Sequence, residues 1–307
     1  MVIIMNEFKK ITTEGINDST KDIDLLSTKE ILLKINEQDS KVANAVYEAI
    51  DQISVVVDAI VETFMNDGRL IYMGAGTSGR IGILDSVECP PTYGVPSNMV
   101  MCLMAGGDNA FVKAVEGAED SKELAVQDLQ RINVSANDIV VGIAASGRTP
   151  YVIGGIEYAK QLGIKTACIT TSKGSVLASL VDYPIEAVTG QEVITGSTRM
   201  KSGTAQKLIC NMLSTASMIK MGKVYSNYMI DVMATNEKLV ARSHTIVSEI
   251  TGCSLDEAKE KIQKYGTIKK ALIAYFTGCE DLNIINQVLS EVKGNIRVAI
   301  DKINKGE

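Results

Sequence analysis

The sequence of 307 residues predicts an α/β protein in which helices flank a parallel sheet. Short apolar runs typical of buried strands alternate with segments long enough to hold a helix, which is the pattern of strand–helix–strand units. Two of these runs pass directly into polar loops, as expected at the carboxyl ends of parallel strands, where such proteins bind ligands. The predicted strands are residues 69–74, 99–104, 138–144, 165–170 and 184–188.

Helical segments are expected before and after the sheet. In residues 1–60, apolar residues recur at helical spacing, and STKE at 27–30 has the form of a capping box, which closes the first turn of a helix. A second such box, SLDE at 254–257, belongs to a mostly helical tail. We therefore expect an N-terminal helical segment at 1–60, a ligand-binding domain at 61–225 and a C-terminal helical region at 226–307.

The composition favours a soluble cytoplasmic protein that binds a small molecule. Lys and Arg number 31 against 37 Asp and Glu, and the basic residues are scattered, which argues against nucleic acid and acidic membranes as partners. The six cysteines lie far apart without a C-x-x-C pair, as expected of reduced thiols and not of a zinc site. No apolar run approaches the ~18 residues that span a membrane. The single histidine, His244, is expected in a helix as a packing or surface residue, which argues against a histidine-dependent triad.

The sequence GAGTSGR at residues 74–80 follows the first strand and predicts an anion-binding turn. Glycines let the backbone approach an oxyanion, the first N–H groups of a helix have no acceptor, and Thr77 and Ser78 add hydroxyl donors. The spacing also satisfies the dinucleotide pattern G-x-G-x-x-G, but no acidic residue ends the next strand at the customary distance, since Asp108 lies 29 positions after Gly79 (108 − 79). A phosphorylated small molecule is therefore favoured over a dinucleotide.

Two further polar loops strengthen this interpretation. SGRTP at 146–150 follows the third strand, and TGSTRMKSGT at 195–204 precedes a helical stretch. Taken alone, Arg148, Arg199 and Lys201 would be surface charges. Because each lies within a polar loop, contact of at least one of them with an anionic substrate is an equal alternative.

Five motifs in a fixed order resemble those of the N-acetylmuramic acid 6-phosphate etherases, a family that carries the sugar isomerase (SIS) domain. They are GAGTSGR at 74–80, ECPPTYG at 88–94, EGAED at 116–120, SGRTPY at 146–151 and TGSTRMK at 195–201. The resemblance implies a SIS-type parallel sheet flanked by helices. It also implies cleavage of the D-lactyl ether of N-acetylmuramate 6-phosphate to N-acetylglucosamine 6-phosphate and D-lactate in bacterial cell-wall amino-sugar catabolism, by a homodimer without metal or organic cofactor.

That chemistry needs two carboxylates in different states of protonation, because one group removes the proton at C2 while another protonates the alkoxide that leaves C3. By resemblance Glu88 is the proton donor and Glu119 is the base. Taken alone, Glu88 would be a solvated carboxylate at a helix end, before a break expected at Pro90, and Glu119 would belong to an exposed acidic face. The residues assigned to binding the sugar phosphate are Thr77, Ser78, Gly79, Ser146, Gly147, Arg148, Thr149, Ser197 and Lys201.

Two other functions share these features. Regulators of the glucokinase-regulator type bind sugar phosphates through similar loops without catalysis. Aminosugar-phosphate isomerases would also use a glutamate base but would keep the substituent at C3. Release of lactate distinguishes the etherase from both.

Overall fold

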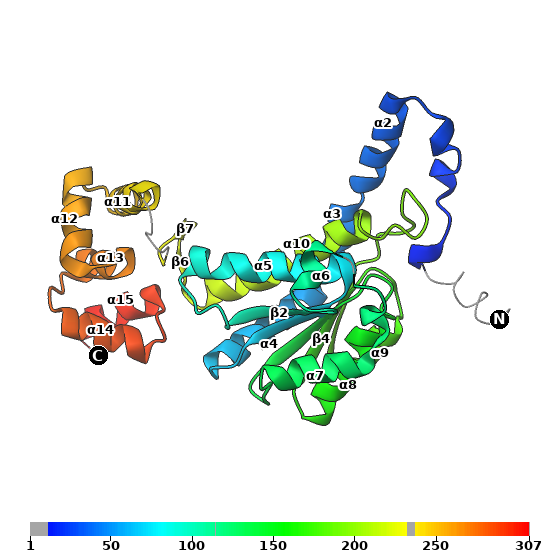
Figure 1. The fold of residues 1–307 in the computed structure, drawn as a ribbon. Coiled ribbons are helices and arrows are strands. Elements are labelled where there is room, and N and C mark those ends of the chain that lie inside the picture. The colour runs from blue at the N-terminus through cyan, green and yellow to red at the C-terminus, as the bar shows by residue number, and fades with distance from the viewer. Residues whose placement is uncertain (1–11, 114, 232–236, 307) are drawn as a thin grey trace. The chain divides into compact units, whose positions relative to one another are not determined.

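A computed structural model describes residues 12–113, 115–231 and 237–306 (Figure 1). Residues 1–11 of the expected N-terminal helical segment, and residues 232–236 of the expected C-terminal region, lie outside the described residues. The chain forms two compact units. The first comprises Met1–Val87 and Ser97–Ser214, and the second comprises Glu88–Pro96 and Thr215–Glu307.

A five-stranded parallel sheet forms the centre of the first unit, which confirms the predicted fold class. Its strands are β1 (Leu70–Gly74), β2 (Val100–Met104), β3 (Ile139–Ile143), β4 (Lys165–Thr170) and β5 (Tyr183–Glu186). They are arranged in the order β2-β1-β3-β4-β5, with every neighbouring pair parallel. Each corresponds to one of the five predicted apolar runs. In this order the chain leaves β1 toward opposite edges of the sheet, so β1 and β3 flank a topological switch point.

Helices cover both faces of this sheet (Figure 1). The helices of the first unit are α2 (Thr28–Asp39), α3 (Val42–Tyr47), α4 (Ile50–Met65), α5 (Gly76–Tyr93), α6 (Asn109–Val112), α7 (Lys122–Arg131), α8 (Pro150–Gln161), α9 (Val176–Leu180) and α10 (Lys201–Lys220), the last turns of α5 and α10 belonging to the second unit. Short 3₁₀ turns are η1 (Thr12–Glu14), η2 (Asp18–Thr20), η3 (Ile23–Leu25) and η4 (Ala118–Asp120). The capping box predicted at 27–30 is present at the start of α2.

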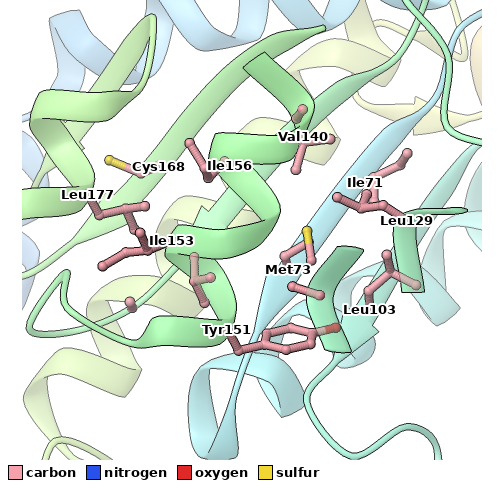
Figure 2. Close-up of a cluster of buried hydrophobic side chains, with 14 of the residues drawn as sticks. Ile71, Met73, Leu103, Leu129, Val140, Tyr151, Ile153, Ile156, Cys168 and Leu177 are labelled. Carbon is pink, nitrogen blue, oxygen red and sulfur yellow. The ribbon is translucent and has the colours of Figure 1, made fainter. Parts of the chain in front are cut away.

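The two faces of the sheet are set by the alternation of side chains along β1. Ile71 and Met73 are fully buried in an apolar cluster with Tyr151 and Ile156 of α8 (Figure 2). Tyr72, between them, points to the other face, where its hydroxyl donates to Asp85 of α5 (3.1 Å) and to the Cys210 carbonyl of α10 (3.3 Å). Successive side chains of β1 therefore point alternately to the face that α7 to α9 cover and to the face that α5 and α10 cover.

The second unit contains a hairpin and a group of helices. The hairpin strands are β6 (Val224–Tyr225) and β7 (Tyr228–Met229), which pair antiparallel. The helices are α11 (Glu237–Thr251), α12 (Leu255–Tyr265), α13 (Ile268–Thr277), α14 (Leu282–Glu291) and α15 (Ile296–Lys305). They enclose their own apolar cluster, which includes Ile246 and Leu272. Ser254 and Glu257 form the predicted capping box of α12, and His244 is half-buried within α11, as expected of a packing residue.

The cysteines and the lengths of the helices bear on two expectations from the composition, reduced thiols and the lack of a membrane span. No disulfide links any of the six cysteines, all of which lie in the described ranges. None of the helices that the structure describes is long and apolar enough to cross a membrane.

Candidate active site

The first polar loop connects β1 to α5 through a turn that only glycines allow. A Cβ atom on Gly74 would lie 2.7 Å from the Gly79 nitrogen, and a Cβ on Gly79 would lie 2.8 Å from Cγ of Met104. Gly76, the first residue of α5, has a φ of +53°. The strand therefore passes into the helix at close range, with the N–H groups of the first turn of α5 at the carboxyl edge of the sheet.

The second polar loop connects β3 to α8. Gly147 has a φ of +64°, and a Cβ there would lie 2.3 Å from Oγ of Ser175. Thr149 takes the N-cap position of α8, followed by a proline at the first helical position, without a hydrogen bond from its own side chain. Ser146 and Thr149 are half-buried and Arg148 is exposed; in the part of the chain that the structure describes, none of the three side chains makes a hydrogen bond or ion pair. Two hydroxyls and a guanidinium are thus available to a ligand.

Helix α10 contacts the carboxyl-end loops of two strands, β1 and β4. Ser78 in the first turn of α5 donates its hydroxyl to Oε1 of Gln206 (2.9 Å). Thr171, just after β4, donates to Oγ of Ser202 (2.9 Å). Sequence reasoning missed Gln206 and Ser202, because their partners are 128 and 31 residues away along the chain.

The start of α10 is already occupied by a carboxylate of the protein. Glu192 is fully buried, and its two oxygens accept from the backbone N–H groups of Lys201 (3.0 Å) and Ser202 (2.9 Å). An acidic side chain at a helix N-terminus satisfies the same donors that would otherwise hold an anion. In the third predicted polar segment, these two backbone N–H groups at the start of the helix are therefore already used by the protein itself, unlike in the first two segments.

Lys201 and Ser197, two predicted ligands of the sugar phosphate, belong to this third segment. Lys201 is 2% exposed, and its Nζ donates to the Thr189 carbonyl (2.9 Å) and to Oε1 of Gln38 in α2 (3.2 Å). Burial lowers the pKa of this amine. Ser197 is half-buried and donates its backbone N–H to the Ile194 carbonyl (2.9 Å). Two of the three N–H donors of Lys201 are thus used within the protein.

A cavity of about 230 Å³ adjoins the first loop. It is lined by Ala75, Gly76, Arg80, Met104, Ala105, Ala110, Val115, Glu116, Gly117 and Glu119. Arg80 donates to the carbonyls of Ala110 (2.8 Å) and Phe111 (2.9 Å), which holds α6, the short helix before the acidic segment, against α5. Glu119 lies in the turn η4 after Gly117, whose φ is +74°. The structure thus brings one of the two predicted catalytic carboxylates to the β1–α5 turn.

Glu88, the other predicted catalytic carboxylate, is an exposed residue of α5 that does not line this cavity. The helix break expected at Pro90 does not occur: α5 continues to Tyr93, with both prolines inside it. The φ of proline is compatible with a helix, but Pro90 and Pro91 each lack the N–H that would donate to the preceding turn, so the helix continues through them without these two hydrogen bonds. The N–H of Gly94 then donates to the Pro90 carbonyl (2.9 Å) and closes the last turn.

Comparison with known proteins identifies the family. Residues 52–160 match the model of the glucokinase regulatory protein N-terminal SIS domain, and residues 117–216 match the SIS domain. An N-acetylmuramic acid 6-phosphate etherase of Colwellia psychrerythraea is 53% identical over 300 residues, which cover 97% of each chain. The chain belongs to the N-acetylmuramic acid 6-phosphate etherase family.

Other relatives agree with this assignment. An N-acetylmuramic acid 6-phosphate etherase of Enterococcus faecalis is 55% identical over 270 residues, which cover 88% of this chain and 91% of that protein. Among solved structures, a putative phosphosugar isomerase involved in capsule formation from Bacteroides fragilis aligns with a TM-score of 0.50 and 25% identity, over 64% of this chain and 95% of its own. This chain thus carries the etherase motifs on a SIS-type sheet, as the sequence predicted.

Proposed function

We propose that this protein cleaves the D-lactyl ether of N-acetylmuramate 6-phosphate with water, giving N-acetylglucosamine 6-phosphate and D-lactate. The observation that carries the proposal is the meeting of a glycine turn at the start of a helix and a carboxylate-lined cavity at the β1–α5 connection, in a chain from the etherase family. In bacteria this reaction belongs to the catabolism of cell-wall amino sugars.

The two glycine turns support binding of the phosphate. The first turn of α5 offers backbone N–H groups with Thr77, Ser78 and Gly79, and the positive end of the helix dipole favours a dianion there. The loop after β3 adds Ser146 and Gly147, with Arg148 and Thr149 beside them. These two loops follow the strands β1 and β3, which flank the switch point of the sheet, where ligands of doubly wound folds bind. Ser197 and Lys201 complete the proposed set of ligands.

Glu119 is proposed as the base. In the open-chain sugar, the C2 proton is acidic because it lies next to the C1 aldehyde. Glu119 takes this proton, the electron pair forms the C2–C3 double bond, and the C3–oxygen bond of the lactyl ether breaks. The exposure of Glu119 at a cavity of about 230 Å³ leaves its carboxylate accessible to a sugar.

Glu88 is proposed as the acid that protonates the departing lactate oxygen, on the strength of the family motif ECPPTYG. Water then adds at C3 of the unsaturated aldehyde, and a proton returns to C2. The two carboxylates can perform these proton transfers in reverse order, because the hydration retraces the elimination with water in place of lactate.

We also propose that the enzyme is a cytoplasmic homodimer. Sedimentation equilibrium should then give twice the chain mass of 33.0 kDa. A single-chain mass at micromolar concentration would exclude the dimer.

The decisive experiment is incubation of the purified protein with N-acetylmuramate 6-phosphate, followed by detection of D-lactate. Equimolar lactate and N-acetylglucosamine 6-phosphate are expected. Binding without lactate would instead favour a sugar-phosphate sensor, the alternative that the match to the regulatory SIS domain supports. Isomerisation with the ether retained would indicate an aminosugar-phosphate isomerase.

A further inference from the structure

Gln206 of α10 is a buried amide with only one of its two ends in use. It is 1% exposed, its Oε1 accepts the hydroxyl of Ser78 (2.9 Å), and its Nε2 has no hydrogen-bond partner in the part of the chain that the structure describes. Leaving a buried amide donor unpaired costs free energy, and such groups are rare in folded proteins. An unpaired donor beside the β1–α5 turn therefore suggests a role for Gln206 other than stabilising the fold.

The amide is held firmly against the first turn of α5. Gly203, three residues earlier on the same face of α10, packs against Thr77, since a Cβ at Gly203 would lie 3.4 Å from Cγ2 of Thr77. Further along the two helices, Asn211 and Ser214 of α10 donate to Asp85 of α5 at 2.6 and 3.0 Å. The parts of α5 and α10 that carry Ser78 and Gln206 are therefore held side by side.

The direction of the Ser78–Gln206 hydrogen bond matters for binding a phosphate. A phosphate oxygen at the start of α5 needs a donor, but the Ser78 hydroxyl hydrogen is directed to Oε1 of Gln206. We propose that Gln206 is a positioning residue that directs the Ser78 hydroxyl toward the substrate phosphate by reversing its amide. This inference rests on the proposed function, because it names a residue that tunes the phosphate subsite.

The reversal needs only half a turn about the last carbon–carbon bond of the side chain. Nε2 then donates to Oγ of Ser78, which gives the unpaired donor an acceptor and releases the hydroxyl hydrogen for the phosphate. Oε1 takes the place of Nε2 and loses its donor. A buried carbonyl oxygen without a donor is tolerated more often than a buried N–H without an acceptor, as backbone groups show. Without a phosphate, the reversal would deprive the Ser78 hydroxyl hydrogen of Oε1 as its acceptor. A bound phosphate oxygen accepts that hydrogen instead, so binding favours the reversed amide.

A double-mutant cycle tests the coupling. Gln206→Met removes both polar atoms at nearly constant length, Gln206→Glu keeps acceptors only, and Ser78→Ala removes the hydroxyl. Affinity for N-acetylglucosamine 6-phosphate is measured by titration calorimetry, and kcat and KM are measured with N-acetylmuramate 6-phosphate. Ser214→Ala is the matched control, because it removes another hydrogen bond between α10 and α5 without touching Ser78.

We expect Gln206→Met to weaken binding roughly fivefold to tenfold and to raise KM more than it lowers kcat. Gln206→Glu should weaken binding by at least about tenfold, because a carboxylate holds the hydroxyl hydrogen and repels the phosphate. In the Ser78→Ala background, Gln206→Met should change the affinity by less than about twofold. Ser214→Ala should leave the affinity unchanged.

Equal losses from Gln206→Met with and without the Ser78 hydroxyl would overturn the inference, as would an unchanged affinity in Gln206→Met. Thermal unfolding checks each variant, and the cycle is repeated with Gln206→Glu if the methionine variant does not fold. Absence of lactate release by the wild-type protein would refute the proposed function alone, since the binding cycle does not depend on turnover.

Discussion

The two ends of the parallel sheet carry similar polar residues and use them differently. At the amino ends, Asp138 is 1% exposed and accepts from the backbone N–H and the guanidinium of Arg69 and from the N–H of Ser135. At the carboxyl ends, Ser146 and Thr149 have side chains with no partner in the described residues, and Nε2 of Gln206 is buried and unpaired. The polar groups compared at the amino ends thus bind one another, whereas some of those at the carboxyl ends have no partner within the described residues.

Asp182, before β5, repeats the pattern of the amino ends. It accepts from the N–H and hydroxyl of Thr166 (2.9 and 2.7 Å) and from Nζ of Lys160 (3.1 Å). A carboxylate with several donors connects the start of one strand to the next. We therefore expect substitutions at the amino ends to change stability, and substitutions at the carboxyl ends to change binding and catalysis.

The largest effect is expected from Asp138→Ala. This variant leaves the Arg69 guanidinium, which is 21% exposed, beside a buried site without its counterion. Removing one partner of such a pair should lower the free energy of unfolding by about 3 kcal/mol. Urea denaturation measures this loss, and kcat/KM of the folded variant should stay within about twofold of wild type. A stable variant with poor catalysis would contradict the division between the two ends.

The next effect concerns the two proposed catalytic carboxylates. Glu88→Gln and Glu119→Gln should each lower kcat by at least ~100-fold, equivalent to about 2.7 kcal/mol, because a general acid or base is lost. Both residues are exposed, so the free energy of unfolding should change by no more than about 0.5 kcal/mol.

Deuterium exchange separates the two roles. In deuterated water, Glu88→Gln should still exchange the C2 proton although lactate is not released, whereas Glu119→Gln should do neither. Exchange in Glu119→Gln but not in Glu88→Gln would reverse the roles. Full lactate release by either variant would remove that residue from the mechanism.

A smaller effect is expected in the loop after β3. Ser146→Ala or Thr149→Val removes one hydroxyl that is free to bind the phosphate, at a cost of about 1.5–3 kcal/mol in binding. KM should therefore rise while kcat changes little. The matched control is Ser179→Ala, whose hydroxyl donates only to the Val176 carbonyl within α9 (2.7 Å). An unchanged KM in both loop variants would exclude this loop from phosphate binding.

The sequence predicted the sheet and the tight turns at its carboxyl edge well. Five apolar runs became five strands, because continuous apolar segments between polar loops have few alternatives to a buried parallel sheet. Glycines such as Gly79 and Gly147 marked tight turns correctly, since their positions allow no side chain.

What the sequence could not predict depends on contacts between distant segments. Ser78 and Gln206 are 128 residues apart, and no local pattern marks a glutamine in a helix as the partner of a loop serine. The contact of Lys201 with Gln38 spans 163 residues, and it buries a lysine that a polar motif would place in solvent. The sequence wrongly predicted that the helix ends before Pro90, because a proline pair usually interrupts a helix. In the structure α5 continues to Tyr93, and the N–H of Gly94 donates to the Pro90 carbonyl in its last turn.

The smallest effect is a difference in acid sensitivity between the two ends of the sheet. Burial works to raise the pKa of Asp138, but hydrogen bonds from Arg69 and Ser135 outweigh it, so that the pKa lies below the ordinary value of 3.8. A carboxyl group whose pKa is lower in the folded state stabilises the fold above its unfolded pKa, and this contribution is lost as the pH falls through the folded value. The free energy of unfolding of the wild-type protein should therefore decline below pH 3.8 more steeply than that of Asp138→Asn, and the difference between them should shrink. Ser146→Ala, at the opposite end, should follow the wild-type curve throughout. Urea denaturation between pH 7 and pH 2.5 measures all three proteins, and parallel curves for wild type and Asp138→Asn would show that Asp138 contributes no pH-dependent stability.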